Sequence, residues 1–316
     1  MERKIIEKTY KNIICISFIV FVLFIGIDFL STRGYTRELI AVLTDSDEYF
    51  ANNGPDFINP IIYQAQKDDG TTKLLLGDSF AYQVFMHLKD YNPDISFLAS
   101  NGAVTMAGQY IIAKEYLDNH PDATDVYLLL LPESIGRTFD TKWGYQYAVL
   151  PFVETETLTE YDEDTLEILE KTYGKIFLNK YIATLIDKSG INRKLYLNYM
   201  RGKTEGYILS DYYELSDKYL VKLSELCKDK GVNLYFYPCP VSEAKRDAVE
   251  IYAETFESTL TYNINPDYYN MIYYYPAEWS GDNTHLEYEY REAEYVDPML
   301  RELLSGTSLL DELNFN

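Results

Sequence analysis

The chain has 316 residues, of which 47% are hydrophobic, and it carries a formal net charge of -22 at pH 7. The hydrophobic share is typical of a packed globular protein, so extended disorder is not expected. The acidic balance argues against nucleic-acid binding, which needs a basic face, and it disfavours a broad contact with anionic lipid headgroups.

An apolar segment near the N-terminus predicts one membrane-spanning helix. Residues 12–30 read NIICISFIVFVLFIGIDFL, and about 20 such residues match the hydrocarbon thickness of a bilayer. Four basic residues precede this segment: Arg3, Lys4, Lys8 and Lys11. The positive-inside rule therefore places the tail 1–11 in the cytoplasm and the rest of the chain outside the cell membrane. A cleaved signal peptide is the alternative, but the sequence DFLSTRG offers no small-x-small cleavage site, which favours a signal anchor.

Beyond the anchor, the chain reads as a stalk followed by one soluble α/β domain. Residues 31–72 form an acidic stalk and lead-in, residues 73–305 the domain, and residues 306–316 a C-terminal tail. Short apolar runs alternate with helical segments, which is typical of a parallel sheet covered on both faces. The predicted strands are KLLLG (73–77), ISFLAS (95–100), VYLLLLP (126–132) and VNLYFYPCP (232–240).

Residues 136–210 interrupt this alternation. The segment is aromatic, acidic and largely helical in pattern, with no clear strand, and it is too long for an ordinary crossover loop. We predict a helical insertion that forms a cap beside the carboxyl edge of the sheet, where such folds bind ligands. Its aromatic side chains would close over that edge and stack on a sugar. The alternative is that the insertion only covers the edge of the sheet.

The cysteines and tyrosines give weaker signals. Cys15, Cys227 and Cys239 form no CxxC motif and no cluster with histidine, which argues against a zinc site, and no cofactor is expected. The positions of Cys227 and Cys239 favour two buried free thiols over a disulfide. Tyrosine occurs 32 times. Its ring and hydroxyl suit carbohydrate faces, although a general composition bias is the preferred explanation of this number.

The first predicted strand ends in Gly-Asp-Ser, at residues 77–79. One interpretation is helix capping, in which Asp78 or Ser79 accepts a hydrogen bond from the first free amides of the next helix. The other is that the turn exposes the Ser79 hydroxyl at the carboxyl edge of the sheet, where it would serve as a nucleophile. The turn alone does not decide between them.

A histidine near the C-terminus favours the second interpretation. His285 is one of three histidines in the chain and follows Asp282 by three residues. This spacing lets the carboxylate hold the imidazole tautomer, and a serine at the tip of a strand then completes a nucleophile, base and orienter set. In the alternative, Asp282 caps a final helix and His285 is an incidental polar residue.

Three short motifs resemble the SGNH, or GDSL, hydrolase family. LLLGDSF is similar to the family's first block, ASNGAVTMAG to its middle turn and GDNTHL to its last block, and together they cover most of residues 73–305 in order. The resemblance implies a flavodoxin-like α/β/α sandwich, for which we expect the strand order 2-1-3-4-5. It also implies that Ser79 is the nucleophile, His285 the general base and Asp282 its orienter. The amides of Ser79 and Gly102 would line the oxyanion hole.

The sequence departs from this family at the third block. The family places an asparagine side chain in the oxyanion hole after the third strand, whereas this chain reads LLLLPESIGR there, without an asparagine. Loss of one such donor costs about 10²–10³ in rate, so Ser134 or a backbone amide is expected to substitute. Similar departures occur in membrane-anchored members that serve cell-envelope glycan acylation, including the alginate acetylation proteins and the D-alanyl transfer protein of teichoic acids.

These features predict a membrane-anchored, extracytoplasmic SGNH-type esterase or O-acyltransferase that acts on acyl groups of cell-surface glycans. The expected partners are the glycan, an acyl donor and an integral-membrane O-acyltransferase. One alternative is a non-catalytic binding or assembly subunit of a membrane O-acyltransferase system, which the absent asparagine favours. Another is an esterase or lipase for small lipids. The intact serine, histidine and aspartate favour an enzyme.

Overall fold

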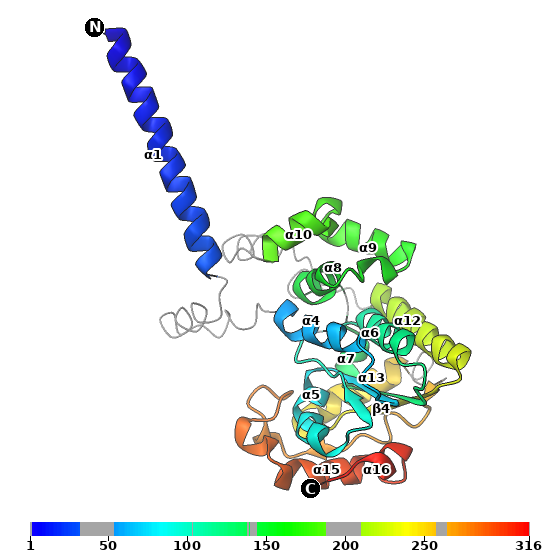
Figure 1. Cartoon of the computed structure of the whole chain (residues 1–316). Helices are drawn as coiled ribbons and strands as arrows, with labels where there is room; N and C mark the ends of the chain where they lie inside the picture. The colour runs from blue at the N-terminus through cyan, green and yellow to red at the C-terminus, as the bar shows by residue number, and fades with distance from the viewer. Residues whose placement is uncertain are drawn as a thin grey trace.

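The structure, a computed structural model, describes residues 2–31, 54–102, 104–137, 139, 144–187, 210–256 and 264–315. Its first element, α1 (Glu2–Ser31), is a 30-residue helix that extends away from the other elements (Figure 1). The stretch Lys8–Gly26 has a mean hydropathy of 1.9, and none of it is buried against the rest of the chain. By length and composition α1 is able to cross a membrane, a test that signal sequences also pass.

A four-stranded parallel sheet forms the centre of the domain. Its strands are β1 (Lys73–Gly77), β2 (Ile95–Phe97), β3 (Asp125–Leu130) and β4 (Asn233–Pro238), in the order β2-β1-β3-β4. Tyr127 of β3 lies opposite Leu75 of β1 on one side and Tyr235 of β4 on the other. The leucines of β1 and β3 are buried, as expected for strands with helices on both faces. The predicted α/β fold with a parallel sheet is confirmed.

The strand order agrees with 2-1-3-4-5 in its first four members. Within the described residues no fifth strand joins this sheet; β5 (Val241–Ser242) and β6 (Tyr274–Tyr275) form a separate parallel pair. β5 continues the chain just past β4, and β6 pairs with that continuation. Pro238 and Pro240 separate the two pairings, because a proline has no amide hydrogen to donate to a ladder.

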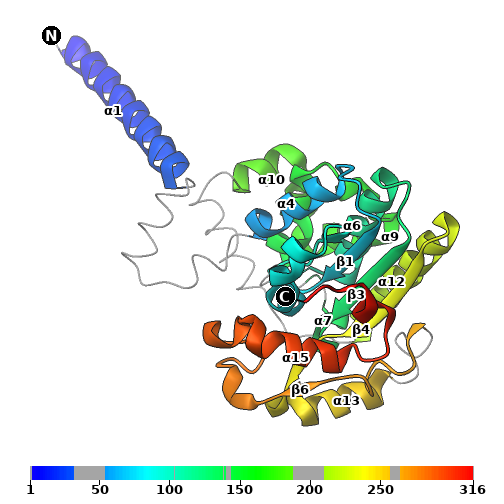
Figure 2. The same ribbon diagram turned by 60° about the horizontal axis from the view of Figure 1, so that its bottom comes forward.

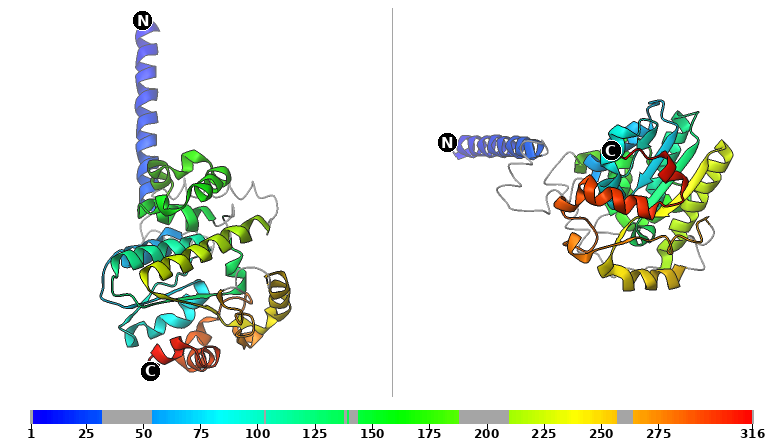
Figure 3. Two further views of the ribbon diagram at one scale, coloured as in Figure 1. Left: turned by 90° about the vertical axis from the view of Figure 1, so that its right-hand side faces the viewer. Right: turned by 90° about the horizontal axis from the view of Figure 1, so that it is seen from below.

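Helices cover both faces of the sheet (Figures 2 and 3). One face carries α4 (Gly54–Ala65), α6 (Met106–Asn119) and α12 (Ser210–Lys230). The other carries α5 (Ser79–Phe85), α15 (Ala293–Leu303) and α16 (Ser308–Glu312). The remaining helices outside the insertion are α13 (Arg246–Phe256), the one-turn α7 (Pro132–Ile135), and the 3-10 turns η1 (Met86–Tyr91), η5 (Glu243–Lys245), η6 (Ala277–Trp279) and η7 (Tyr288–Arg291).

The folded domain extends beyond the predicted limits 73–305 at both ends. Ile58 and Ile62 of α4 are fully buried in the core, and so is Leu309 of α16. The predicted stalk and lead-in and the predicted tail therefore each contribute a helix to the domain. The acidic composition of the lead-in hid the apolar residues of α4, which lie four apart and so share one helix face.

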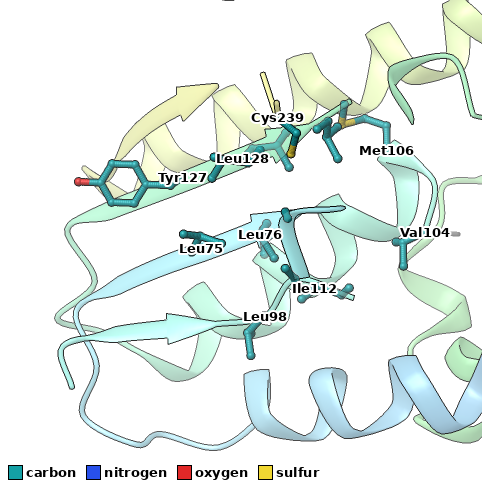
Figure 4. Close-up of a cluster of buried hydrophobic side chains, with 14 of the residues drawn as sticks. Leu75, Leu76, Leu98, Val104, Met106, Ile112, Tyr127, Leu128 and Cys239 are labelled. Atoms are coloured by element: carbon teal, nitrogen blue, oxygen red, sulfur yellow. The ribbon is translucent and has the colours of Figure 1, made fainter. Parts of the chain in front are cut away.

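The core between the sheet and the helices is aliphatic. Figure 4 shows Leu75 and Leu76 of β1 and Leu128 of β3 in one cluster with Ile112 of α6, and all four are fully buried. Burial of one such side chain stabilises a protein by about 1.5–3 kcal/mol. This layer gives the carboxyl edge of the sheet a rigid base.

The described part of the insertion predicted at 136–210 consists of short helices joined by turns, without a strand, and residues 138, 140–143 and 188–209 lie outside the described part. Its elements are η2 (Tyr145–Val149), a π-helical turn, then α8 (Leu150–Glu154), η3 (Leu158–Glu160), α9 (Glu163–Tyr173), η4 (Lys175–Leu178) and α10 (Lys180–Asp187). It packs on the outer side of the α4, α6 and α12 layer: Tyr161 contacts Tyr219 of α12 edge to face, with ring centroids 6.3 Å apart.

Most of the aromatic residues in the described part of the insertion face inward, although Tyr181 is 83% exposed. Six of them are at most 7% exposed: Phe139, Tyr145, Tyr147, Phe152, Tyr161 and Tyr173. They pack edge to face on one another, for example Tyr145 on Tyr173 at 5.6 Å. The expectation that the insertion's aromatics stack on a sugar is therefore wrong for these six, because they form the insertion's own core.

Candidate active site

The Gly-Asp-Ser turn follows β1 directly and begins α5. Asp78 is the N-cap of α5: its Oδ1 accepts hydrogen bonds from the amides of Phe80 (3.0 Å) and Ala81 (3.2 Å). Its Oδ2 accepts from the amide of Leu131, just after β3, at 2.8 Å. Asp78 is 2% exposed, so it is a structural carboxylate that joins the ends of two strands. Asp78 thus performs the capping, and the hydroxyl of Ser79 is left for another role.

Gly77 is required by the close approach of β3 and α5. A Cβ at this position would lie 2.7 Å from the carbonyl oxygen of Leu129 and would overlap the side chain of Ala81. The Gly77 carbonyl accepts a hydrogen bond from Nε2 of the fully buried Gln109, in α6, at 3.0 Å. The backbone that leads into Ser79 is therefore held by β3, α5 and α6 at once.

The second part of the site is the turn 280–286, called the histidine turn below. Asn283 has a φ of 61°, a left-handed conformation that asparagine tolerates better than most residues. Asp282 Oδ1 accepts hydrogen bonds from the amides of Thr284 (2.8 Å) and His285 (2.7 Å). The local turn therefore brings the carboxylate and the imidazole together.

The histidine turn is held at both of its ends. The Glu287 amide donates to the Trp279 carbonyl at 2.8 Å, and the indole of Trp279 stacks on Tyr290 with centroids 5.3 Å apart. The Leu286 amide donates to Oε1 of Gln83, in α5, at 3.2 Å. These contacts fix the turn against the helix that begins with Ser79.

Ser79, His285 and Asp282 form a continuous hydrogen-bonded chain. Ser79 Oγ lies 2.8 Å from His285 Nε2, and His285 Nδ1 lies 2.7 Å from Asp282 Oδ2. A carboxylate only accepts hydrogen bonds, so Nδ1 carries the ring proton and Nε2 is free to accept from the serine hydroxyl. This is the tautomer that a general base requires. The fold thus joins two predicted residues that lie 206 positions apart in the chain.

The electrostatics of the site favour a charged Asp282. Partial burial raises the pKa of its carboxyl group, but hydrogen bonds from the His285 side chain and from the His285 and Thr284 amides outweigh burial and hold the pKa well below its ordinary value. The side chains of Asp282 and His285 are 57% and 34% exposed. The carboxylate therefore stays ionised near neutral pH, where it stabilises the imidazolium that forms when His285 accepts a proton.

One predicted oxyanion donor, the Gly102 amide, already has a partner. It donates to Ser100 Oγ at 3.0 Å. A Cβ on Gly102 would lie 3.1–3.2 Å from Tyr147 of η2 and Ile58 of α4. Both the insertion and α4 therefore pack closely against this turn. To stabilise an oxyanion, the amide would have to leave Ser100 or share its hydrogen between two acceptors.

A further predicted donor, Ser134, lies in α7 directly after β3. It is 2% exposed, and its hydroxyl has no hydrogen-bond partner among the described residues. Leaving such a group unpaired costs about 1–3 kcal/mol, and exceptions of this kind call for an explanation such as a functional role. In contrast to the Gly102 amide, this donor is not engaged by another part of the described chain.

Two further polar side chains, Lys245 and Glu133, meet Thr284 of the histidine turn, and none of the three is a predicted site residue. Lys245 Nζ, in η5, donates to Glu133 Oε1 at 2.6 Å and also to Thr284 Oγ1. Glu133 lies in α7, the one-turn helix just after β3. The only signal in the sequence was the position of Glu133 just after an apolar strand.

The two cysteines of the domain are buried free thiols, as expected. Burial raises the pKa of Cys227 to about 12, so its thiolate is not available as a nucleophile near neutral pH. Cys239 Sγ lies 3.9 Å from Asp78 Oδ1, which places the end of β4 beside the turn as well. No three His, Cys, Asp or Glu side chains of the described ranges are arranged to hold a metal ion.

Comparisons with known proteins supply no relative for this chain: no family model, no curated protein and no solved structure matches it. A functional argument therefore depends on the geometry of the site.

Proposed function

We propose that this chain is a membrane-anchored serine esterase or O-acyltransferase of the SGNH type, whose domain lies outside the cell membrane and acts on O-acyl groups of cell-surface glycans. In this proposal Ser79 is the nucleophile, His285 the general base and Asp282 its orienter. The observation that carries the proposal is the chain of two hydrogen bonds, 2.8 Å from Ser79 to His285 and 2.7 Å from His285 to Asp282.

The chemistry follows from these contacts. Ser79 Oγ attacks the ester carbonyl while His285 takes the hydroxyl proton, which it then gives to the departing alcohol. The resulting acyl-serine reacts with water in hydrolysis or with a sugar hydroxyl in transfer. The oxygen that becomes negative in each step needs fixed donors, for which the Ser79 and Gly102 amides and the Ser134 hydroxyl are the candidates.

Two other features support this proposal. The order β2-β1-β3-β4, with β6 beside the continuation of β4, fits a flavodoxin-like SGNH sandwich. The helix α1, which carries its basic residues at its N-terminal end, fits an anchor that leaves the domain on the outer side of the cell membrane, next to an integral-membrane partner that would deliver the acyl group.

A non-catalytic subunit of a membrane O-acyltransferase system is the second candidate. Two observations favour it: the Gly102 amide donates to Ser100 Oγ, and the third block supplies the carboxylate of Glu133 in place of an asparagine amide. A carboxylate does not donate to an oxyanion, so an oxyanion hole at this position is weaker unless Ser134 completes it.

Labelling with a fluorescent fluorophosphonate separates the two candidates. The full chain, purified in detergent, is treated with the probe, and the modified peptide is identified by mass spectrometry. An activated serine gives one label on Ser79 that is absent from the Ser79→Ala variant, while Ser305→Ala serves as a matched control on an exposed serine. An unlabelled wild-type chain that is folded by circular dichroism would make the non-catalytic subunit the better account.

A second assay distinguishes transfer from hydrolysis. The enzyme receives an activated acyl ester with and without oligosaccharide acceptors. We expect acylated oligosaccharide as a product. Release of the acid alone, at a rate that no acceptor alters, would instead identify a plain esterase.

The orientation is tested by adding a protease to intact cells that carry the full chain. An outward-facing domain is digested and leaves a short N-terminal fragment. Protection of the whole domain would contradict the orientation inferred from the basic tail.

A further inference from the structure

A partly buried ion pair connects the segment after β3 to the histidine turn. Lys245 Nζ donates to Glu133 Oε1 at 2.6 Å and to the hydroxyl of Thr284, and Thr284 Oγ1 lies 3.4 Å from the same oxygen of Glu133. The three residues come from η5, α7 and the histidine turn. Each of these segments lies beyond the carboxyl end of a strand or in the turn itself, so the contact ties three separate parts of the site together.

The burial of this pair sets it apart from the surface ion pairs of the same region. The side chains of Lys245 and Glu133 are 23% and 21% exposed, whereas the neighbouring pair of Arg246 and Glu243 is 45% and 50% exposed. Exposed pairs contribute little to stability. Removing one partner of a mostly buried pair leaves an uncompensated charge, and here it also disturbs the position of Thr284, which the pair contacts.

Thr284 is the residue through which this pair acts on the site. Its amide donates to Asp282 Oδ1 at 2.8 Å, its carbonyl accepts from the Tyr275 hydroxyl at 3.2 Å, and it immediately precedes His285. A shift of Thr284 therefore moves the orienter and the base together. Since Ser79 lies on a different element, the 2.8 Å contact between Ser79 and His285 depends on where the turn is held.

We propose that Lys245 is a positioning residue. While paired with Glu133, it donates a hydrogen bond to the Thr284 hydroxyl and so holds the histidine turn at the distance from Ser79 that proton transfer requires. This inference rests on the proposed function, because it assigns the turn a catalytic role. Its physical content is a restraint on residues 280–286, which is measurable whether or not the chain is an enzyme.

The test compares Lys245→Met with Arg246→Met in the full chain. Both variants remove one cation from adjacent positions, but only the first removes the contact with Thr284. With a fluorophosphonate, we expect Lys245→Met to lower kinact about 10- to 100-fold at unchanged KI, since a misplacement of about 1 Å costs up to 10² in rate. Arg246→Met stays within about twofold of the wild type for both constants.

Hydrogen exchange gives the second readout. In Lys245→Met we expect faster amide exchange in peptides that cover 280–287, with no change in peptides of β1 or β3. Thr284→Val keeps the branched shape, removes the hydroxyl and leaves the ion pair between Lys245 and Glu133 in place. It therefore tests the same contact even if the Lys245→Met variant fails to fold. We expect it to act in the same direction, and the double variant to be less than additive, as for residues of one network.

The outcomes separate the two proposals. If the wild type is labelled and both Lys245→Met and Thr284→Val match Arg246→Met in kinact and in exchange, the positioning role is overturned while the proposed function stands. If the wild type is not labelled, the proposed function fails, and exchange in 280–287 still decides whether Lys245 restrains the turn.

Discussion

The two edges of the sheet each carry a histidine paired with an aspartate, and the pairs differ in what the second ring nitrogen meets. At the carboxyl edge, His285 Nδ1 contacts Asp282 at 2.7 Å and Nε2 faces the hydroxyl of Ser79. At the amino edge, His120 Nε2 contacts Asp69 at 3.1 Å, and Nδ1 faces the carbonyl oxygen of Tyr116 at 2.9 Å. The second ring nitrogen of His285 therefore faces a hydroxyl, which is able to give up a proton. The second ring nitrogen of His120 faces a carbonyl oxygen, which has no proton to give.

Exposure separates the two pairs as well. The His120 side chain is 1% exposed and its ring stacks on Tyr116 with centroids 3.8 Å apart, whereas the His285 side chain is 34% exposed. A buried imidazole with both nitrogens engaged by fixed groups joins a helix end to a loop. A half-exposed imidazole beside a serine is able to exchange protons with a substrate.

The third histidine supports the same distinction. His87 Nε2 contacts Asp297 Oδ1 at 2.6 Å and thereby links η1 to α15, while its Nδ1 is buried without a partner in the described residues. All three histidines of the chain are thus paired with an aspartate. A histidine–aspartate pair alone is therefore no sign of a catalytic site in this chain. The group that contacts the second ring nitrogen of the histidine is the feature that distinguishes a candidate catalytic pair from a structural one.

Substitution of the triad tests this distinction with the largest expected effect. Ser79→Ala and His285→Ala should each lower ester turnover by about 10⁴ or more, because the residues act as a unit. For the same reason the double variant should be no slower than either single one. Thermal unfolding should be nearly unchanged. Wild-type turnover in Ser79→Ala would mean that another nucleophile is at work.

Asp282→Asn should act in the same direction but less strongly. The amide keeps most of the shape and loses the charge that stabilises the imidazolium, so we expect turnover about 10- to 100-fold above that of Ser79→Ala. Steady-state kinetics on one activated ester suffice for the measurement. A loss equal to that of Ser79→Ala would show that the tautomer depends entirely on this carboxylate.

His120→Gln should lower stability and leave turnover nearly unchanged, the reverse of the triad variants. Loss of the buried ring and its hydrogen bonds should lower the free energy of unfolding by about 2 kcal/mol, while kcat/KM stays within about twofold. Denaturant unfolding followed by tyrosine fluorescence gives the first number. A large loss of turnover in a stable His120→Gln chain would contradict the assignment of this pair to structure.

The smallest expected effect is the loss, at low pH, of the stability that the Asp69 carboxylate contributes. Burial raises the pKa of Asp69, but hydrogen bonds from the Thr71 side chain and amide and from His120 outweigh it, so the pKa in the fold lies below its ordinary value. Stability from a lowered carboxyl pKa is present above the unfolded value of about 3.9 and is lost as the pH falls through the folded value. The Tm difference between wild type and Asp69→Asn should therefore be constant from about pH 7 to pH 5 and shrink below about pH 4. A difference that does not shrink at all as the pH falls below about 4 would contradict it.

Much of the site was accessible from the sequence because its signals are local. An apolar run that ends in Gly-Asp-Ser indicates Ser79 at the tip of a strand, and a spacing of three indicates that Asp282 and His285 meet in one turn. The structure confirms both of these placements. Their catalytic roles stay predictions.

The contacts that the sequence did not reveal are long-range. Lys245 and Glu133 lie 112 positions apart and no motif pairs them, so only the fold brings them together. The insertion has the aromatic composition of a sugar-binding surface, yet six of its described aromatic residues are buried. The sequence pattern does not distinguish a helix face in solvent from a face that packs on another helix. The pairing of β6 with the continuation of β4 depends on two prolines whose effect on sheet pairing is not visible from strand propensity.

The double use of the Gly-Asp-Ser turn has an evolutionary consequence. Asp78 bonds to amides at the start of α5 and after β3, and Gly77 fills a space that no larger residue fits, so both are needed to fold the domain. Ser79 and His285 carry no such duty. If the proposed function holds, a descendant of this chain that lost it would be expected to keep Gly77 and Asp78 and to vary at Ser79 and His285.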